Sequence, residues 1–246
     1  MTPSEIQTCE TLRFVLENIS SQRQRILEVG CGNGVLSQHL QGLGHEIVAI
    51  DSSAESIADA RRISIDARVA SFPDFDESPF DVILFTRSLH HIRPLEPVLV
   101  QAHRLMKPSA LLLVEDFAYS DTSQHTARWF YALLALLESC SVLLSAEDSF
   151  GRKLLNGRGN VSVWRDHVHE INTAEDLRQA ISKHFLIKEV KPAPYLYRYV
   201  CAMVNDDDRA GQIISNVLEL EKETGLKIDQ FLIGRRFVAQ AKSSNQ

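Results

Sequence analysis

The segment Ile26–Gly34, with the sequence ILEVGCGNG, limits the possible folds more than any other part of this 246-residue chain. A short apolar run that ends in closely spaced glycines is typical of a buried parallel strand that turns tightly into a helix. Glycine accepts positive φ angles and lets another molecule approach the backbone, because it has no Cβ. The next helix, expected over Val35–Gln41, presents its free N–H groups to that molecule. The segment therefore predicts a ligand-binding turn.

The spacing of the glycines bears on the kind of ligand. A dinucleotide fingerprint requires Gly-x-Gly-x-x-Gly/Ala, whereas this chain has Gly30, Gly32 and Gly34, with Val35 where the last small residue would stand. A second apolar strand, EIVAID (Glu46–Asp51), ends in an acid that is placed to accept both hydroxyls of a ribose. The pattern favours a nucleoside ligand without matching the dinucleotide motif.

On these residues the chain resembles the class I S-adenosylmethionine-dependent methyltransferases, whose first motif is an acid, an apolar residue and Gly-x-Gly-x-Gly. Two further segments extend the resemblance. Phe80–Ile92 is similar to the family's fourth strand and following loop, and Leu105–Phe117 to its Leu-x-Pro-Gly-Gly turn and fifth strand. Ser109 and Ala110 replace the two glycines of that turn. The resemblance covers about Arg25–Phe117 and becomes weaker towards the end of the chain.

The order of the expected elements predicts an α/β fold. After a leading helix that starts with a capping box at Thr2-Pro3-Ser4-Glu5, strands and helices alternate, which indicates a doubly wound, mostly parallel sheet. The resemblance implies seven strands, an antiparallel last strand and a helical cap insertion. The first five strands are expected near Ile26–Gly30, Ile47–Ile50, Arg68–Ala70, Asp81–Phe85 and Ala110–Glu115. The helices between them are expected near Val35–Gln41, Ala54–Arg62 and Leu95–Met106.

The alternation stops after residue 117. We expect residues 1–117 to form the leading helix and the cofactor-binding half, 118–171 a cap insertion with a helix over about Gln124–Leu144, and 172–246 the rest of the sheet. Two interpretations of the insertion stay open: a cap over the substrate, or a helix that covers the sheet or forms a homodimer contact. A helix starting at Thr173 and a strand at Phe185–Lys191 follow. The last strand is either 197–204 or, as we favour, 234–242 after a helix near Asp208–Glu223.

Composition and charge argue against several partners. The net charge of −6 and the lack of a basic stripe disfavour nucleic acid. DNA amino-methyltransferases of this fold carry Asn/Asp-Pro-Pro-aromatic after the fourth strand, where this chain reads Thr86-Arg87-Ser88-Leu89. The N-terminus lacks a secretory signal pattern and the longest apolar run, Trp129–Leu137, is too short for a membrane span. Four separated cysteines suit a reducing compartment, so we expect a cytoplasmic protein.

The resemblance implies a set of residues that bind S-adenosylmethionine. Glu28 would reach the amino group of the cofactor, the glycine-rich backbone would line its methionyl part, and Asp51 would take the ribose hydroxyls. Ser71 stands where the family usually has an acid beside the adenine, so that contact is expected to be weaker. The implied cofactor-binding residues are Glu28, Gly30, Cys31, Gly32, Asp51, Ser52, Ser71, Phe72, Thr86 and Arg87.

Catalytic residues are harder to assign from the sequence. Methyl transfer from a sulfonium is an in-line displacement that needs mainly alignment, and a general base only for some oxygen and nitrogen acceptors. Histidine titrates near neutral pH, which suits proton removal, and the candidates are His91, His167 and His169. No metal site is expected, because Thr86-Arg87 lacks the Asp of the metal-dependent catechol-type members.

We therefore expect a methyltransferase that acts on a small-molecule acceptor at oxygen or nitrogen and releases S-adenosylhomocysteine. Two alternatives remain open at the level of sequence. One is a nicotinamide oxidoreductase, which Val35 and the fourth-strand motif disfavour. The other is a non-catalytic protein that keeps the cofactor site. The sequence does not identify the acceptor or the methylated atom.

Overall fold

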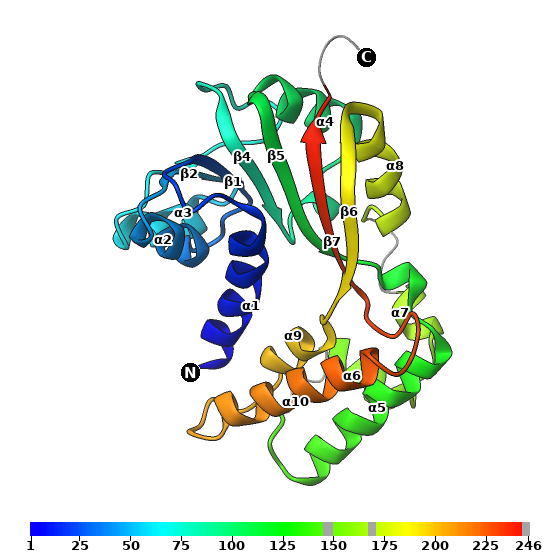
Figure 1. The fold of residues 1–246 in the computed structure, drawn as a ribbon. Helices are drawn as coiled ribbons and strands as arrows, with labels where there is room; N and C mark the ends of the chain where they lie inside the picture. The colour runs from blue at the N-terminus through cyan, green and yellow to red at the C-terminus, as the bar shows by residue number, and fades with distance from the viewer. Residues whose placement is uncertain (145–149, 167–170, 243–246) are drawn as a thin grey trace. The chain divides into compact units, whose positions relative to one another are not determined.

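The computed structural model describes residues 1–144, 150–166 and 171–242, and a seven-stranded sheet organises them (Figure 1). The strand order is β3-β2-β1-β4-β5-β7-β6, and β1 pairs in parallel with both β2 and β4. Figure 1 shows β7 pointing opposite to β4. The fold class expected from the sequence is confirmed. The strands are β1 (Arg25–Val29), β2 (Glu46–Asp51), β3 (Ala67–Val69), β4 (Phe80–Thr86), β5 (Met106–Phe117), β6 (Phe185–Ala193) and β7 (Gly234–Ala241).

Two of the helices begin at capping boxes that the sequence provides. Thr2 and Glu5 exchange backbone and side-chain hydrogen bonds at the start of α1, and Thr173 and Asp176 form the same capping box at α8. No helix in the described part of the chain is long and apolar enough to cross a membrane. The α-helices are α1 (Pro3–Asn18), α2 (Val35–Gly42), α3 (Ala54–Arg62), α4 (Leu95–Arg104), α5 (Gln124–Ser139), α6 (Phe150–Asn156), α7 (Ser162–Asp166), α8 (Ala174–His184), α9 (Leu196–Cys201) and α10 (Ala210–Gly225); the 3₁₀ turns are η1 (Leu89–His91) and η2 (Tyr119–Asp121).

Some element boundaries differ from those expected. Helix α5 ends at Ser139 rather than Leu144, because Ser141 adopts a positive φ of 55° and Leu143 then forms a β-bridge with Val204. Strand β5 begins at Met106 rather than Ala110, and it passes through the expected turn with Ser109 at a φ of 65°. That angle explains why the resembled family has glycine at this place.

The end of the chain follows the favoured interpretation. The other candidate for the last strand, residues 197–204, is not a strand, because Leu196–Cys201 form the short helix α9. The last strand is β7, which the structure places between β5 and β6. The helix expected near Asp208–Glu223 is present as α10.

The contacts divide the chain into two units. The sheet unit comprises residues 8–116, 171–191 and 235–246, and the helical unit comprises residues 1–7, 117–170 and 192–234. The helical unit is thus larger than the expected insertion 118–171, because α9 and α10 pack into the same apolar core as α5 and α6. Its core includes Phe130, Trp164, Tyr197 and Ile214, all at most 1% exposed.

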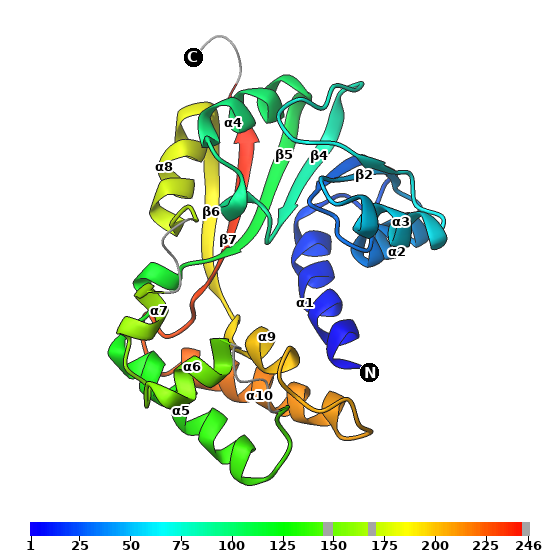
Figure 2. The same cartoon turned by 180° about the vertical axis from the view of Figure 1, so that it is seen from behind.

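In the sheet unit the central strands β1 and β4 are buried on both faces, whereas the edge strand β6 is largely exposed. Along β4, Val82 and Leu84 contribute to one apolar cluster and Ile83 and Phe85 to another, as expected for alternating side chains. The first cluster includes side chains of α1 and α2, and the second includes side chains of α4 and α8. Figure 2, seen from behind, shows α4 and α8 on the same face of the sheet. This layering leaves the carboxyl ends of the parallel strands as the place for a site.

Candidate functional site

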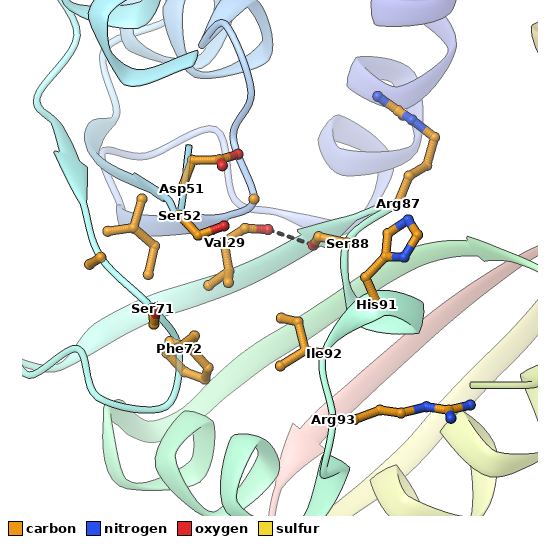
Figure 3. Close-up of a pocket in the computed structure, with 13 residues that line it drawn as sticks. Val29, Asp51, Ser52, Ser71, Phe72, Arg87, Ser88, His91, Ile92 and Arg93 are labelled. Carbon is orange, nitrogen blue, oxygen red and sulfur yellow. Dashed lines mark hydrogen bonds between the residues drawn. The ribbon is translucent and has the colours of Figure 1, made fainter. Parts of the chain in front are cut away.

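A cavity of about 530 Å³ lies at the carboxyl ends of the parallel strands of the sheet unit (Figure 3). Strand β1 has β2 on one side and β4 on the other, so the cavity lies where the strand order reverses, the usual ligand site of an open α/β sheet. Its volume is within the range of small-molecule and cofactor sites. The cavity is lined by Val29, Gly30, Ile50, Asp51, Ser52, Ala70, Ser71, Phe72, Arg87, Ser88, His91, Ile92 and Arg93.

The glycine-rich turn after β1 is folded tightly against the loop after β4. Gly30 has a φ of 77°, and a Cβ at this position would lie 2.4 Å from the Cβ of Ser88. The Ser88 hydroxyl donates to the carbonyl oxygen of Val29 over 2.6 Å. The N–H groups of Gly30 and Cys31 both donate to the carbonyl oxygen of Ile50, at 2.8 and 3.0 Å. Only glycine fits at position 30, because the two loops touch there.

Asp51, the last residue of β2, links the turn to helix α3. Its Oδ2 accepts a hydrogen bond from the N–H of Gly32 at 2.9 Å, and its Oδ1 accepts one from the N–H of Ser53 at 2.9 Å. The carboxylate also faces the cavity, as Figure 3 shows. It is therefore held in place by two backbone groups while it remains accessible to a ligand.

Glu28 lies beneath the turn and outside the lining of the cavity. It is 2% exposed, and its carboxylate accepts hydrogen bonds from Ser37 Oγ at 2.6 Å and Thr86 Oγ1 at 3.2 Å. Burial raises the pKa of Glu28 to about 7, and the two hydroxyls and the charge of Arg87 oppose that rise. The side chain therefore ties β1 to α2 and β4.

Ser71 and Phe72 form the side of the cavity that follows β3. Phe72 is 6% exposed and packs edge-on against Phe85 of β4, with 5.6 Å between ring centroids. Figure 3 places both residues across the cavity from Ile92 and His91. A flat apolar wall with one hydroxyl beside it suits an aromatic ring that carries polar edges.

Arg87 follows β4 in a left-handed conformation, with a φ of 60°. Its backbone N–H donates to the carbonyl oxygen of Glu115 at 2.7 Å. Its side chain reaches Thr11 of α1 and the carboxylate of Glu115, at 3.2 and 3.3 Å. Arg236 of β7 binds the other oxygen of Glu115 through two nitrogens. Arg87 is therefore directed towards α1 at the edge of the cavity (Figure 3).

Two adjacent histidines follow in η1. His90 is buried, with its Nδ1 2.7 Å from Asp116 Oδ1 and its N–H donating to Asp116 Oδ2 at 3.1 Å. His91 is exposed, lines the cavity and packs its ring on that of His90, with 3.9 Å between centroids. Partial burial and the neighbouring His90 lower the pKa of His91, and Asp116 opposes them. These effects favour the neutral form of the His91 ring.

The structure brings together most of the residues expected from the sequence. Glu28, Cys31, Gly32 and Thr86 lie outside the lining of the cavity, and their proposed contacts stay predictions. His167 and His169 lie outside the described residues. The expected residues that line the cavity are Gly30, Asp51, Ser52, Ser71, Phe72, Arg87 and His91.

Other residues of the lining were not expected from the sequence. Ser88, Ile92 and Arg93 belong to the Phe80–Ile92 motif or follow it directly, so the motif itself carried a signal for them. Asn172, which hydrogen-bonds to this loop from far along the chain, had no signal in the sequence. Within residues 1–144, 150–166 and 171–242, no group of three His, Cys, Asp or Glu side chains is arranged to hold a metal ion.

Comparison with known proteins identifies the family. The sequence profile of the methyltransferase-domain family matches residues 6–180, which is more than half of the chain. The chain belongs to this family. The match includes the glycine-rich turn, Asp51, Ser71, Phe72 and the loop after β4, which together line the cavity.

Individual relatives agree with this membership. The chain is 30% identical over 122 residues to a ubiquinone biosynthesis O-methyltransferase of Pelagibacter ubique. The aligned region covers 42% of this chain and 50% of the relative. A protein of the same description from Xylella fastidiosa is 31% identical over 112 residues, covering 42% and 46%. The chain thus matches about half the length of these curated relatives.

Solved structures support the fold. The N-methyltransferase NodS from Bradyrhizobium japonicum, in complex with S-adenosylhomocysteine, superposes with a TM-score of 0.56 at 11% identity over 98% of this chain and 88% of NodS. An S-adenosylmethionine-dependent methyltransferase from Mesorhizobium loti gives a TM-score of 0.57 at 15% identity over 93% of this chain and 95% of that protein. At these identities the similarity shows the fold alone.

Proposed function

We propose that this protein is an S-adenosylmethionine-dependent methyltransferase that methylates an oxygen or nitrogen of a small molecule. The observation that carries the proposal is the cavity between the glycine-rich turn, Asp51 and the loop after β4. Membership of the methyltransferase-domain family supports the reaction type.

The residues around the cavity fit the proposed cofactor. A Cβ built on Gly32 would meet no atom of the described structure within 4 Å, so the backbone of the turn is open to a ligand there. Asp51 presents a carboxylate that is suited to two adjacent ribose hydroxyls. Ser71 and the ring of Phe72 are suited to an adenine edge and face.

Little chemistry is required of the protein in this reaction. S-adenosylmethionine supplies a methyl group on a positively charged sulfur, which an oxygen or nitrogen of the acceptor displaces in line. The glycine-rich turn and Asp51 would hold the donor in one orientation. The loop after β4 would close the other side of the cavity, with His91 at its surface.

We assign to His91 the removal of the acceptor's proton. Its lowered pKa favours the neutral imidazole, in which one ring nitrogen is unprotonated and can accept a proton from a hydroxyl or ammonium group. His167 and His169 remain candidates for the same role. We expect the reaction to leave S-adenosylhomocysteine and a methylated acceptor.

A small molecule is the preferred acceptor. The relatives described as ubiquinone biosynthesis O-methyltransferases favour a hydroxyl acceptor, whereas NodS is described as an N-methyltransferase, so either atom is retained. The net charge of −6 disfavours nucleic acid. A cytoplasmic location stays part of the proposal, and a homodimer contact through the insertion 118–171 stays the alternative to a cap over the substrate.

Calorimetric titration with S-adenosylhomocysteine and, separately, with NAD tests the proposal. We expect heat with the first ligand at one molecule per chain and none with NAD. Binding of NAD alone would favour an oxidoreductase and contradict the proposal. Transfer of label from methyl-labelled S-adenosylmethionine to a panel of phenols and amines then tests catalysis, and binding without any labelled product would indicate a non-catalytic protein.

A further inference from the structure

Asn172, just before helix α8, is bonded to the loop that forms one wall of the cavity. Its backbone N–H donates to the carbonyl oxygen of His90 at 2.9 Å. Its side-chain Nδ2 donates to the carbonyl oxygens of Leu89 at 3.2 Å and Ile92 at 2.9 Å, and its Oδ1 accepts from Arg93 Nε at 3.1 Å. One residue therefore bonds to four of the five positions from Leu89 to Arg93, all except His91 in the middle.

The chemistry of these bonds specifies the side chain. Asn172 is 7% exposed, and it acts as a double donor at one end and an acceptor at the other. A carboxylate of the same shape could accept from Arg93 but would face two carbonyl oxygens without a proton to donate. An apolar side chain would leave those carbonyl oxygens buried without these donors, which is costly. Only an amide satisfies all three side-chain bonds.

The rest of the wall is fixed by other groups. Ser88 anchors the start of the loop on the carbonyl oxygen of Val29, and Asp116 holds the ring and the N–H of His90. Asn172 adds bonds on both sides of His91 and reaches Ile92, which also lines the cavity. The position of His91 and Ile92 relative to the glycine-rich turn thus depends on a residue that is itself absent from the lining.

We propose that Asn172 is a positioning residue for the site, which fixes the loop Leu89–Arg93 so that His91 and Ile92 face the ligand. The identity of that ligand rests on the proposed function, but the effect on the loop does not. The role is distinct from general stabilisation of the fold, because the bonds end on the loop around His91, and Ile92 and Arg93 among the bonded residues line the cavity.

The test uses the full-length variants Asn172→Ala and Asn172→Asp, with Asn18→Ala as the matched control. Asn18 also donates through Nδ2 to a backbone carbonyl, that of Phe14, and does not line the cavity. Two quantities are measured on protein that circular dichroism shows to be folded. They are the affinity for S-adenosylhomocysteine by calorimetry and the imidazole resonance of His91 in the free protein by NMR.

We expect each Asn172 variant to bind S-adenosylhomocysteine about tenfold more weakly, which corresponds to about 1.4 kcal/mol, and to shift or broaden the His91 resonance. Asn18→Ala should change neither quantity. An unchanged affinity together with an unchanged His91 resonance in Asn172→Asp, the variant of the same shape, would overturn the proposal.

The two proposals fail separately. If wild-type protein gives no heat with S-adenosylhomocysteine, the proposed function is lost, and the His91 resonance of the free variants still decides whether Asn172 positions the loop. If wild-type protein binds and the variants bind equally well with an unchanged resonance, the proposed function stands and the positioning role is rejected.

Discussion

The Asp51 carboxylate both holds the glycine-rich turn and lines the cavity, and substitution tests its role in binding. In the structure it accepts the N–H groups of Gly32 and Ser53 and faces the cavity. We expect Asp51→Ala to weaken binding of S-adenosylhomocysteine 10- to 100-fold, or about 1.4–2.7 kcal/mol, because hydrogen bonds to a charged acceptor are lost. Asp51→Asn, which keeps the shape of the side chain and one acceptor oxygen, should lose less affinity for S-adenosylhomocysteine than Asp51→Ala. Calorimetry measures both, and equal affinity of Asp51→Ala and wild type would remove Asp51 from the site.

Glu28 is expected to destabilise the protein at neutral pH. Its pKa in the folded state is raised from 4.5 to about 7 because the carboxyl group is buried. Between about pH 4.5 and 7 the folded protein therefore keeps a proton on Glu28 that the unfolded chain releases. The contribution of this carboxyl group to the free energy of unfolding is greatest below pH 4.5 and is lost as the pH rises through 7. A shift of this size corresponds to roughly 3 kcal/mol at most.

The variant Glu28→Gln tests whether Glu28 lowers the free energy of unfolding as the pH rises. Its free energy of unfolding relative to wild type should rise between about pH 4.5 and 7 and then stay constant, because the amide has no proton to lose and the hydroxyls of Ser37 and Thr86 can either donate or accept. Urea unfolding at pH 5 and pH 8 measures the difference. Glu46→Gln, at an exposed carboxylate whose pKa Arg25 lowers, should show no gain at pH 8. A Glu28→Gln curve parallel to wild type would contradict the assignment.

At the scale of elements, a second buried acid shows that the hydrogen-bond partners of a carboxylate decide whether its replacement by an amide stabilises or destabilises the protein. Glu221 of α10 is fully buried and accepts the N–H groups of Tyr195, Leu196 and Tyr197 at the start of α9, at 2.6–3.0 Å. Burial raises its pKa to about 7, as for Glu28. The partners of Glu221 differ from the hydroxyl partners of Glu28, because a hydroxyl can donate or accept a hydrogen bond whereas a backbone N–H can only donate.

We therefore expect Glu221→Gln to destabilise the protein at pH 8 by about 1–3 kcal/mol, because the new NH₂ group faces a backbone donor. Glu28→Gln should stabilise it under the same conditions. Urea unfolding compares the two variants, and hydrogen exchange of the amides of residues 195–197 should become faster in Glu221→Gln only. A change of the same sign in both variants would show that burial alone, rather than the partners, sets the outcome.

Elements with strong periodicity and caps were predictable, and irregular ones were not. The capping box expected at Thr2 and the helix start expected at Thr173 placed the starts of α1 and α8 correctly. The short helices α6, α7 and α9 lack such signals, and the end of α5 depends on the pairing of Leu143 with Val204, which are distant in sequence. Local propensity carries no information on contacts of that kind.

The residues of the site likewise divide into those that a sequence pattern predicts and those that it does not. Glycine spacing and strand-terminal residues gave Gly30, Asp51 and Ser71, because a parallel sheet brings the carboxyl ends of its strands to one edge. Asn172 was missed, since an isolated Asn in a connection has no pattern. Glu28 was assigned to the cofactor by resemblance. The structure shows its hydrogen bonds to Ser37 and Thr86, and its contact with the cofactor stays a prediction.

At the scale of the whole molecule, the sheet followed from the alternation of strands and helices, but the membership of the helical unit did not. That unit joins residues 117–170 to residues 192–234, with helix α8 and most of strand β6 between them in the sequence. Periodicity indicates which face of a helix is buried, and not which distant helix covers it. The chain crosses between the units five times, so neither unit is a continuous segment.

These crossings lead to a prediction about cooperativity. Both tryptophans, Trp129 and Trp164, lie in the helical unit, whereas every residue that lines the cavity belongs to the sheet unit. A ligand at 100 times its Kd stabilises the folded state by about 2.7 kcal/mol, or roughly 5–10 °C in Tm for a chain of this size. We expect S-adenosylhomocysteine to raise the midpoint followed by tryptophan fluorescence as much as the midpoint followed by circular dichroism. NAD serves as the control, and a fluorescence midpoint that stays fixed while the dichroism midpoint rises would show that the two units unfold independently.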